Sequence, residues 1–323
     1  MRAVVLRSAG QPLQMEDRPA PTGPDVIQVL ACGVCHSDLH VVDGVYPSPM
    51  PLVLGHEVTG LHAELGPVMV YAPWGCRRCD MCASGQEMLC PNGMEIGLFQ
   101  DGGYTEQFAV KDRVYLHPLG SLDPVRAAPL ACGGLTAYRA VKHSLETLRR
   151  SADPRVLVLG AGGLGQFAVQ YLRMLTDAQV YAGDLSSSKR NRAVQLGAHQ
   201  AFDPADASAT GAAGTFDVVI DFVGATATLS SAVDRVRRQG LIVVVGLFGG
   251  RVPFGLGAVP HEARLMSSIW GSNAELAELL QLARRQPLEY TVEALPLSHA
   301  NEAHDRLRRG DVDGRFVLVP ELG

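Results

Sequence analysis

Apolar residues from position 155 onward alternate between short uniform runs and longer runs with helical spacing. The uniform runs, which predict buried strands, cover residues 155–160, 180–184, 216–221 and 241–246. Over residues 164–175 apolar residues recur every three or four positions, as on one face of a helix. Two further helices are predicted, one that Ser186 caps and Gly197 ends, and one over residues 226–238 that ends at Gly240. Strands with no polar side, separated by amphipathic helices, are typical of a parallel sheet that helices cover on both faces.

The first 130 residues have a different pattern, in which short apolar runs are separated by Gly and Pro. Runs at 26–30 and 107–110 lie among proline-rich segments, which is typical of a β-rich domain of short strands and loops. A final stretch, residues 273–319, carries two helical patterns and a strand at 315–319. The 323 residues also suit two domains, at about 150 residues per domain. We therefore expect an α/β protein with two domains.

Composition and charge exclude several classes of protein. Hydrophobic residues make up 47% of the chain and charged residues 19%, a balance typical of globular proteins. The net charge of −5 is spread without long runs, which argues against nucleic acid or an anionic membrane as the main partner. No apolar stretch approaches the length of about 18 residues that a membrane span needs, and the first residues lack the apolar core of a signal peptide. The expectation is a cytoplasmic protein with reduced cysteines.

Four of the seven cysteines fall within fifteen residues: Cys76, Cys79, Cys82 and Cys90. Four thiolates on one short loop complete the tetrahedral shell of a structural zinc ion. Arg77 and Arg78, between the first two cysteines, would offset the thiolate charge. Chance clustering and an iron–sulfur cluster are the alternatives, although ferredoxin spacings differ from this one.

A glycine-rich segment follows the first strand of the predicted parallel sheet. Gly160, Gly162 and Gly165 form the pattern GxGxxG, with Gly163 and Leu164 inside it, and Asp184 lies nineteen residues after Gly165. In this context the motif predicts a dinucleotide-binding turn, in which the glycines let the backbone approach a pyrophosphate at a helix N-terminus.

Asp184 would accept hydrogen bonds from the adenosine ribose and repel a 2′-phosphate, so NAD is favoured over NADP. Lys189 is near enough to join the ribose contacts. The alternative interpretation is a glycine-rich turn in an unrelated α/β protein.

Further candidate metal ligands lie near the N-terminus, in the segment from Cys32 to His40 and in Gly55-His56-Glu57. With the cysteine loop and the glycine motif following in this order, nearly the whole chain resembles the zinc-dependent medium-chain alcohol dehydrogenases, in particular the bacterial NAD-dependent enzymes.

The resemblance implies a role for each matching position. Cys35, His56 and Cys132 match the ligands of a catalytic zinc ion, and Glu57 belongs to the same metal site. Ser37 and His40 match a proton relay that passes through the nicotinamide ribose, and Asp38 is expected to orient a neighbour of the zinc site. Cys32 is left over, and we interpret it as buried packing. The cofactor positions that the resemblance adds are His36, Val223, Gly246, Leu247 and Arg315.

The same resemblance implies a GroES-like β-barrel domain, residues 1–133 completed by 271–323, and a Rossmann domain, residues 134–270, with the active site in the cleft between them. Aromatic candidates for the pocket wall are Tyr46, Trp74, Phe99 and Trp270. The family assembles by pairing the edges of Rossmann sheets, so we expect residues 265–270 at a contact in a homo-oligomer, a tetramer or a dimer.

The expected reaction is hydride transfer between a zinc-bound primary or secondary alcohol and NAD, which gives an aldehyde or a ketone. Zinc can lower the pKa of bound water from 15.7 to about 7, and a comparable shift would make an alcohol ionisable near neutral pH. A non-catalytic NAD-binding sensor or scaffold on the same fold is the first alternative. A zinc-ribbon protein that binds nucleic acid is the second, and the scarcity of basic residues around positions 76–90 disfavours it.

One segment departs from the family. Between His56 and Cys76 the chain lacks about ten residues that the family usually has, a loss that a surface loop tolerates easily. The loss of part of a strand would instead shorten the barrel beside the catalytic zinc, so the shape of the substrate pocket is expected to differ.

Overall fold

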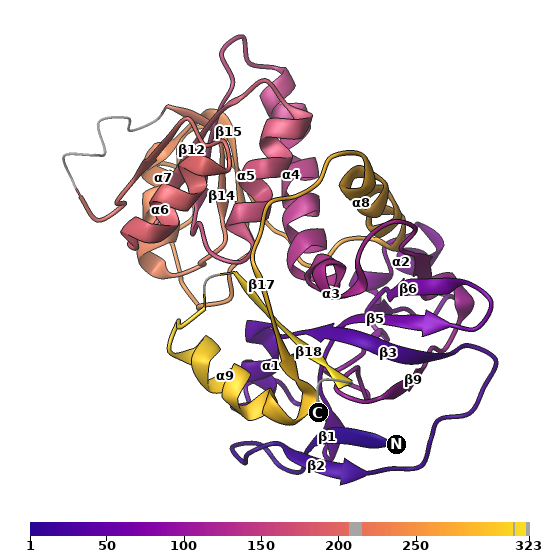
Figure 1. Ribbon diagram of the computed structural model, residues 1–323. Helices are drawn as coiled ribbons and strands as arrows, with labels where there is room; N and C mark the ends of the chain where they lie inside the picture. Colours follow the sequence, from indigo (N-terminus) through magenta and orange to yellow (C-terminus); the bar gives the residue numbers. More distant parts are fainter. Residues whose placement is uncertain (207–214, 313, 321–323) are drawn as a thin grey trace. The chain divides into compact units, whose positions relative to one another are not determined.

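The computed structural model describes residues 1–206, 215–312 and 314–320. The chain divides into two compact units (Figure 1): Met1–Leu135 together with Trp270–Gly323, and Thr136–Ile269. These bounds differ by no more than two residues from the domain boundaries expected from the sequence.

The first unit is built on a mostly antiparallel seven-stranded sheet. Its strand order is β10-β6-β5-β3-β18-β17, and β9 pairs with β3. The strands are β3 (Val26–Gly33), β5 (Glu57–His62), β6 (Gly66–Val70), β9 (Gln107–Ala109), β10 (Leu116–Pro118), β17 (Val292–Pro296) and β18 (Arg315–Val319). Two smaller sheets complete the unit, β2-β1-β4 and β7-β8. Their strands are β1 (Arg2–Leu6), β2 (Gln14–Asp17), β4 (Leu52–Val53), β7 (Pro73–Trp74) and β8 (Met94–Glu95).

Short helices join these strands. They are α1 (His36–Val42), α2 (Asp80–Ala83), α3 (Pro124–Ala127), α8 (Asn273–Arg285) and α9 (Ala300–Arg308), and the 3-10 helices are Glu87–Leu89, Arg113–Tyr115, Ala128–Ala131 and Leu297–His299. Helix α8 starts at a capping box, in which the Ser272 hydroxyl accepts a hydrogen bond from Glu275 N–H and the Glu275 carboxylate accepts one from Ser272 N–H. The buried side chains of α8 include Leu276, Leu279 and Leu280, which agrees with the helical pattern predicted from the sequence.

The segment after His56, which is expected to be shorter than in the family, forms a tight hairpin. Strands β5 and β6 pair in register from Thr59–Met69 to His62–Gly66, so only residues 63–65 connect them. Strand β6 also pairs with β10 on its other side. Both strands therefore keep their places in the sheet, and the connection between them is short.

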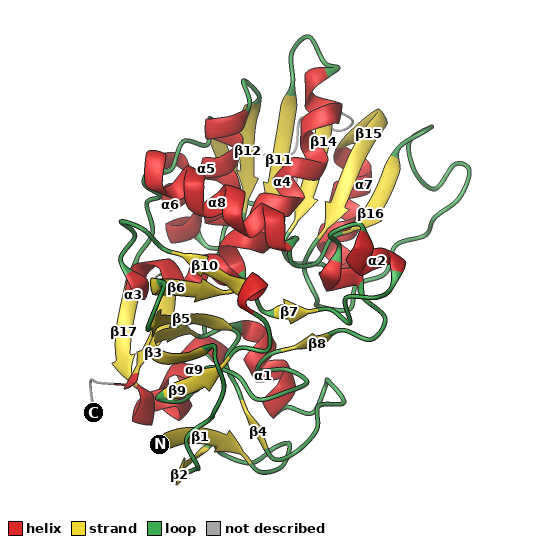
Figure 2. Cartoon of the chain, turned by 90° about the vertical axis from the view of Figure 1, so that its right-hand side faces the viewer, coloured by secondary structure: helices red, strands yellow, loops and turns green. Residues whose placement is uncertain are grey.

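The second unit contains a six-stranded parallel sheet. Five of its strands, β12, β11, β14, β15 and β16, lie side by side in Figure 2. The order β13-β12-β11-β14-β15-β16 is the 3-2-1-4-5-6 order of a dinucleotide-binding fold. The strands are β11 (Arg155–Leu159), β12 (Gln179–Gly183), β13 (Gln200–Phe202), β14 (Phe216–Asp221), β15 (Val236–Val244) and β16 (Arg264–Ser267). The helices are α5 (Gly165–Leu175), α6 (Ser187–Gln195), α7 (Thr226–Arg235) and most of α4 (Gly133–Arg149).

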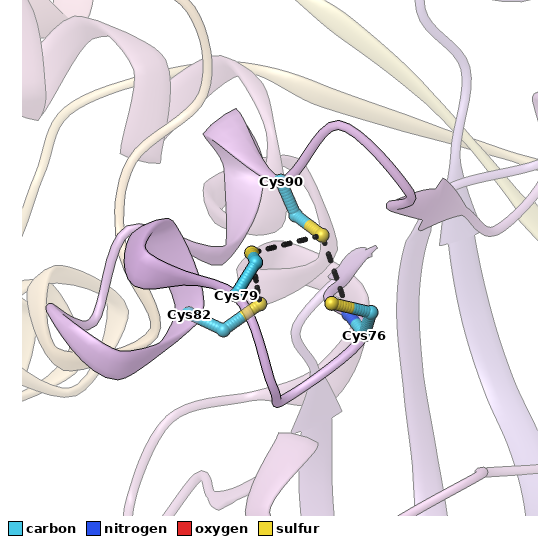
Figure 3. A group of neighbouring side chains, drawn as sticks. All are labelled: Cys76, Cys79, Cys82 and Cys90. Carbon is cyan, nitrogen blue, oxygen red and sulfur yellow. Dashed lines mark hydrogen bonds between the residues drawn. The ribbon is translucent and has the colours of Figure 1, made fainter.

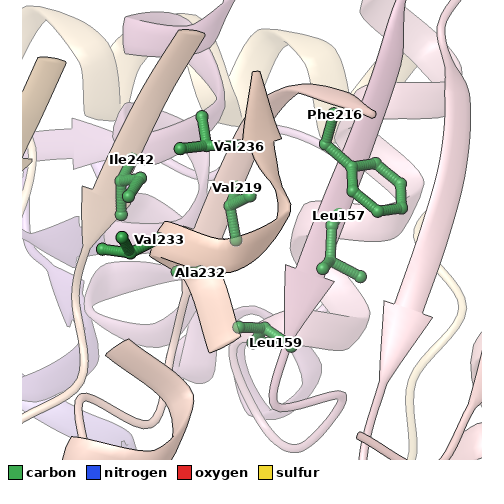
Figure 4. Close-up of a cluster of buried hydrophobic side chains, with 8 residues drawn as sticks. All are labelled: Leu157, Leu159, Phe216, Val219, Ala232, Val233, Val236 and Ile242. Carbon is green, nitrogen blue, oxygen red and sulfur yellow. The ribbon is translucent and has the colours of Figure 1, made fainter. Parts of the chain in front are cut away.

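One cluster of buried apolar side chains fixes α7 on this sheet (Figure 4). Its members come from β11, β14, β15 and α7: Leu157, Leu159, Phe216, Val219, Ala232, Val233, Val236 and Ile242. Full burial of such a side chain contributes about 1.5–3 kcal/mol. The uniform apolar character of the strands follows from this packing, because helices cover the sheet.

The predicted helix over residues 226–238 is wrong only in its last three residues, 236–238. Helix α7 ends at Arg235, and strand β15 begins at Val236. Val236 pairs with Phe216 in β14 and is fully buried, and the Arg237 side chain donates to the Asp217 carboxylate at 2.5 Å. The β-branched Val236 thus packs into the core from an extended backbone, and tertiary packing outweighs the helical spacing.

Among the described residues, no helix is long and apolar enough to cross a membrane.

Candidate functional site

A buried group of metal-ligating side chains lies in the first unit. It consists of Cys35, His56, Glu57 and Cys132, whose ligand atoms all lie within 4.8 Å of one another. Three separate connections supply them. Cys35 caps the N-terminus of α1, His56 immediately precedes β5, and Cys132 follows the 3-10 helix Ala128–Ala131.

Strand pairing brings these segments together. In the register between β3 and β5, Gly33 lies opposite Glu57, so Cys35 and His56 emerge from neighbouring strands at the same point. A Cβ atom on Gly33 would lie 1.9 Å from Glu57 Oε2. Glycine is therefore required where β3 runs into the metal-binding segment.

The donor set fits a catalytic zinc ion. Two thiols and one imidazole are ligands that zinc prefers, and a catalytic site keeps a further position open. His56 is fully buried, yet its Nε2 atom has no hydrogen-bond partner among the described residues. Such a buried nitrogen lone pair is costly unless it binds something. A hydrogen bond from Cys132 and the nearby His56 hold the pKa of Cys35 well below its usual range, so Cys35 is poised as the thiolate that a metal requires.

The carboxylate of Asp38 lies against the ring of His56. It is fully buried on α1, and its Oδ1 lies 3.2 Å from His56 Nδ1. Its Oδ2 accepts hydrogen bonds from Cys35 N–H at 2.8 Å and from the Tyr104 hydroxyl at 3.0 Å. The carboxylate faces Nδ1, which favours a proton there and leaves Nε2 as the lone pair for a metal.

Glu57 is held on the other side of the group. Its Oε1 accepts hydrogen bonds from Arg315 and from Gly133 N–H, while Oε2 has no hydrogen-bond partner among the described residues. Burial raises the pKa of Glu57 to about 7, against the opposing influence of Arg315. Arg315, which the sequence places near the cofactor pyrophosphate, is thus a buried partner of Glu57 in the first unit.

The residues of the expected relay lie beside Cys35. Ser37 Oγ lies 3.8 Å from Cys35 Sγ, and burial raises the pKa of Tyr46, an effect that the Ser37 side chain offsets in part. The Tyr46 ring meets the His40 ring edge-on at 5.8 Å and lies 6.3 Å from the ring of Phe99. Ser37, Tyr46 and His40 therefore form one local group on α1 and the loop that follows it.

The other aromatic candidates for the pocket wall separate into two kinds. Trp270 meets the His56 ring edge-on at 5.3 Å, so it lies directly against the metal-ligating group. Trp74 instead stacks on Tyr115 at 5.7 Å and donates to the Tyr71 carbonyl. Trp74 is thus held in an aromatic stack of the core.

The sulfur atoms of Cys76, Cys79, Cys82 and Cys90 point toward one another around α2 and the 3-10 helix that follows (Figure 3). Cys79 Sγ lies 3.6 Å from the sulfurs of both Cys82 and Cys90. Four sulfurs bound to zinc at about 2.3 Å would be about 3.8 Å apart, so this spacing fits the ion. Hydrogen bonding from Arg78 N–H lowers the pKa of Cys76 to about 6, which favours a thiolate. Arg77, expected to offset the thiolates, pairs with Asp112.

The glycine motif lies at the carboxyl end of β11 in the second unit, where the strand order reverses. Gly160 has a φ of +85°, and a Cβ atom there would lie 2.7 Å from the Val223 side chain. A Cβ atom on Gly165 would lie 2.0 Å from the Gly160 carbonyl oxygen. The turn therefore needs glycine for its backbone conformation and for close packing of α5.

The other expected cofactor positions of this unit surround the same edge of the sheet. Asp184 accepts a hydrogen bond from Ala161 N–H at 2.9 Å, and Gly246 packs on the backbone of Val223. Lys189 Nζ would lie 3.9 Å from a Cβ atom on Gly162. Leu247 is exposed directly after Gly246. Gly163 and Leu164 form the turn that opens α5. His36 belongs to the first unit, where it is exposed at the start of α1.

Sequence reasoning missed two partners of the metal-ligating group. Tyr104 and His304 are both buried. Tyr104 forms a hydrogen bond with Asp38, and His304 forms one with Tyr104. Tyr46 was expected only as a pocket wall, and its contact with Ser37 was missed. His304 falls on the buried face of α9 together with Ala300, Ala303 and Leu307, and a histidine at a core position of a helical pattern is a signal that could have drawn attention to it.

A parallel sheet with a glycine-rich turn, and a separate β unit with thiol and imidazole ligands, define a zinc-binding dehydrogenase. Residues 23–121 match the family described as "Alcohol dehydrogenase GroES-like domain", and residues 163–285 match "Zinc-binding dehydrogenase". The chain belongs to the zinc-dependent medium-chain alcohol dehydrogenase family. The predicted fold class, a GroES-like domain with a Rossmann parallel-sheet domain, is confirmed, as is the predicted zinc-dependent alcohol dehydrogenase activity.

Individual relatives match over their full length. An alcohol dehydrogenase of Geobacillus stearothermophilus is 35% identical, with 98% of this chain and 99% of the relative covered. An NAD-dependent alcohol dehydrogenase of Sulfolobus acidocaldarius is 33% identical, with 98% and 99% covered. The crystal structure of the alcohol dehydrogenase of Aeropyrum pernix superposes with a TM-score of 0.89 at 31% identity and covers 99% of this chain and 100% of that one.

Proposed function

We propose that this protein interconverts small primary or secondary alcohols with aldehydes or ketones, using NAD, at a zinc ion held by Cys35, His56 and Cys132. The convergence of these buried ligand atoms within 4.8 Å of one another carries the proposal. Glu57 belongs to the same group of ligand atoms, and its carboxylate accepts a hydrogen bond from Arg315. Zinc bound there supplies Lewis-acid polarisation, which makes an alcohol hydroxyl easier to deprotonate.

The residues around Cys35 handle the proton. Oxidation of an alcohol removes a hydride, which NAD accepts, and a proton, which must leave a buried site. Ser37 Oγ is close to Cys35 Sγ, at 3.8 Å, and is suited to accept that proton. His40 is partly exposed on the same helix and is suited to release it to solvent. Tyr46, Phe99 and Trp270 form the wall that the alcohol's carbon chain meets.

The cofactor is held by the second unit in this proposal. The motif of Gly160, Gly162, Gly163, Leu164 and Gly165 accommodates the pyrophosphate at the N-terminus of α5. Asp184, with Lys189 nearby, binds the adenosine ribose, and Val223, Gly246 and Leu247 border the nicotinamide half. His36 and Arg315 remain predicted cofactor contacts on the strength of the family resemblance.

We further propose that the functional domains are a catalytic domain, residues 1–133 with 271–323, and an NAD-binding domain, residues 134–270. Each chain would bind a second zinc ion at Cys76, Cys79, Cys82 and Cys90. Because free thiolates repel one another, this loop is expected to lose its conformation without metal. Analysis of the zinc-loaded protein should find two zinc ions per chain.

The protein is proposed to work in the cytoplasm as a homo-oligomer, a tetramer or a dimer. Strand β16 supports this arrangement, because it forms the edge of its sheet. Phe254 and Leu256 in the segment before β16 are largely exposed, at 69% and 98%, and large exposed apolar patches mark interaction surfaces.

The substitution Cys35→Ser tests the catalytic role. Loss of a zinc ligand should reduce NADH formation by at least about 10³-fold, and the zinc content should fall from two ions per chain to one. Binding of NAD, measured by calorimetry, should stay within about twofold because the cofactor turn is in the other unit. Turnover that survives the substitution would refute the proposed metal site.

A further inference from the structure

A continuous chain of buried polar side chains extends from the zinc-ligand group to the C-terminal helix α9. It runs from His56 through Asp38 and Tyr104 to His304. Asp38 and Tyr104 are fully buried, and His304 is 3% exposed. Nothing in the proposed reaction uses Tyr104 or His304, although polar groups at such depth are costly unless each has a partner.

The donors in this chain can be assigned. An ionised carboxylate only accepts hydrogen bonds, so the Tyr104 hydroxyl donates its single proton to Asp38 Oδ2, at 3.0 Å. The Tyr104 oxygen then accepts from His304 Nε2–H, at 3.3 Å. His304 is therefore the tautomer with its proton on Nε2. Burial lowers the pKa of His304, which favours this neutral form.

Tyr104 also supports the backbone that carries His56. Its N–H donates to the Leu54 carbonyl at 2.9 Å, and the neighbouring Gly103 N–H donates to the Gly55 carbonyl at 2.8 Å. The ring lies so close that a Cβ atom on Gly55 would be 2.4 Å from it. Tyr104 thus packs on the residue before His56 and donates to Asp38 at the same time.

His304 is fixed in turn by the contact of α9 with α1. Four residues further along α9, Arg308 forms an ion pair with Asp43, the residue that ends α1, at 2.6 Å. Residues four apart lie on the same face of a helix, so Arg308 and His304 both face the segment that contains Asp38. The far end of the polar chain is therefore anchored in the fold.

We propose that Tyr104 and His304 are positioning residues of the catalytic metal site, which hold Asp38 Oδ2 so that Oδ1 faces Nδ1 of His56. Asp38 has no lysine or arginine partner among the described residues, so its buried charge depends on these donors. Removal of the Tyr104 hydroxyl frees Oδ2 to rotate, and the imidazole loses its fixed orientation. The proposal rests on the proposed role of His56 as a zinc ligand.

The test measures zinc release from the full-length, zinc-loaded protein into excess chelator. Cys35→Ser identifies which kinetic phase belongs to the catalytic site, and the four-cysteine site is a reference in the same molecule. Loss of a hydrogen bond to a group that orients a zinc ligand costs about 10–100-fold in metal affinity. Tyr104→Phe should therefore accelerate release from the catalytic site by about 10-fold or more and leave release from the four-cysteine site unchanged.

His304 should act only through Tyr104. His304→Phe should accelerate release about 3- to 10-fold, as for one hydrogen bond, and His304→Gln, which keeps an N–H donor, should restore most of the wild-type rate. The double variant should match Tyr104→Phe alone, because the two residues form one chain. Tyr290→Phe, which loses another buried hydroxyl donor, is the control and should leave the catalytic phase unchanged.

The possible results separate the hypotheses. Wild-type protein that holds no zinc sensitive to Cys35→Ser would overturn the proposed metal site itself. If zinc is held but Tyr104→Phe releases it at the wild-type rate, or if both sites are accelerated equally, the positioning role is wrong. If Tyr104→Phe does not fold, the comparison of His304→Phe with His304→Gln tests the proposal instead. Equal rates of zinc release from the catalytic site in these two variants would refute it.

Discussion

Asp184 follows β12 directly, and both of its carboxylate oxygens have backbone partners. Oδ2 accepts from Ala161 N–H in the glycine-rich turn, and Oδ1 accepts from Ser186 N–H, each at 2.9 Å. The carboxylate is therefore held at the end of the strand, and its negative charge is fixed at the place where the ribose of a dinucleotide is expected.

This charge should decide between NAD and NADP. Asp184→Asn keeps the shape and an acceptor for Ala161 N–H but removes the repulsion of a 2′-phosphate. The ratio of kcat/KM for NADP to that for NAD should rise by about 10-fold or more, since one unfavourable contact between charges is worth about 1–2 kcal/mol. Steady-state kinetics with both cofactors measures the ratio.

Asp203→Asn is the matched control, because Asp203 is the acidic neighbour that accepts from Arg190 on the same side of the sheet. It should leave the ratio within about twofold. An unchanged ratio in Asp184→Asn, or an equal rise in both variants, would show that Asp184 does not select the cofactor.

The sequence predicts those individual site residues that occur at fixed distances from one another in a motif. The glycine motif and Asp184 are recognisable because a strand, a turn and a helix must follow one another at set distances. Tyr104 and His304 are not recognisable in this way, because no fixed spacing links them to the site. Tyr104 lies 66 residues after Asp38, and His304 lies 200 residues after Tyr104. Only the folded sheet and the docking of α9 bring them together.

The β5–β6 hairpin shows how a single element adapts to a shorter connection. His62 is the last residue of β5, and its Nδ1 accepts from the N–H groups of Glu64 and Leu65, both at 3.2 Å. On its other side Nε2 lies 3.3 Å from Asp25, which Arg113 also holds, at 2.7 Å. One imidazole thus satisfies two N–H groups of the tight turn.

His62→Leu should destabilise this element. It leaves two partly exposed backbone N–H groups of the turn without their acceptor, and each lost hydrogen bond costs about 0.5–1.5 kcal/mol. The free energy of unfolding in urea, measured with excess zinc, should fall by the sum of these two contributions. Glu64→Gln, which weakens only an exposed ion pair with Arg113, should change it by less than about 0.5 kcal/mol. Equal effects of the two substitutions would contradict this role of His62.

Element boundaries were the less predictable part of the fold. Strands β11, β12 and β14 and helix α5 of the second unit follow from apolar runs and spacing, because the sheet and its helices bury them. Strands β13 and β16 and helix α4 were not predicted. The junction of α7 and β15 does not, since Val236 is apolar in either conformation and its burial against Phe216 decides the outcome. Sequence spacing likewise indicated a shortened segment but not that a hairpin would retain both strands.

At the scale of the whole molecule, association of chains should depend on the segment around β16. Light scattering coupled to gel filtration should find a tetramer or a dimer. The double variant Phe254→Asp/Leu256→Asp places two charges in this exposed apolar segment and should shift the mass to a smaller species, because like charges would then face each other across a symmetric contact.

Val194→Asp introduces the same kind of charge at an exposed apolar position of α6 and should leave the mass unchanged. A monomeric wild-type protein, or a double variant with the wild-type mass, would contradict this account of assembly.

The most direct test of the central claim is NADH formation by the zinc-loaded protein. The protein is mixed with NAD and a panel of short primary, secondary and aromatic alcohols, with NADP in parallel, and its zinc content is determined in the same samples. We predict two zinc ions per chain, turnover of at least one alcohol with NAD, and much slower turnover with NADP. A protein that holds both zinc ions and NAD but forms no NADH with any alcohol would contradict this prediction.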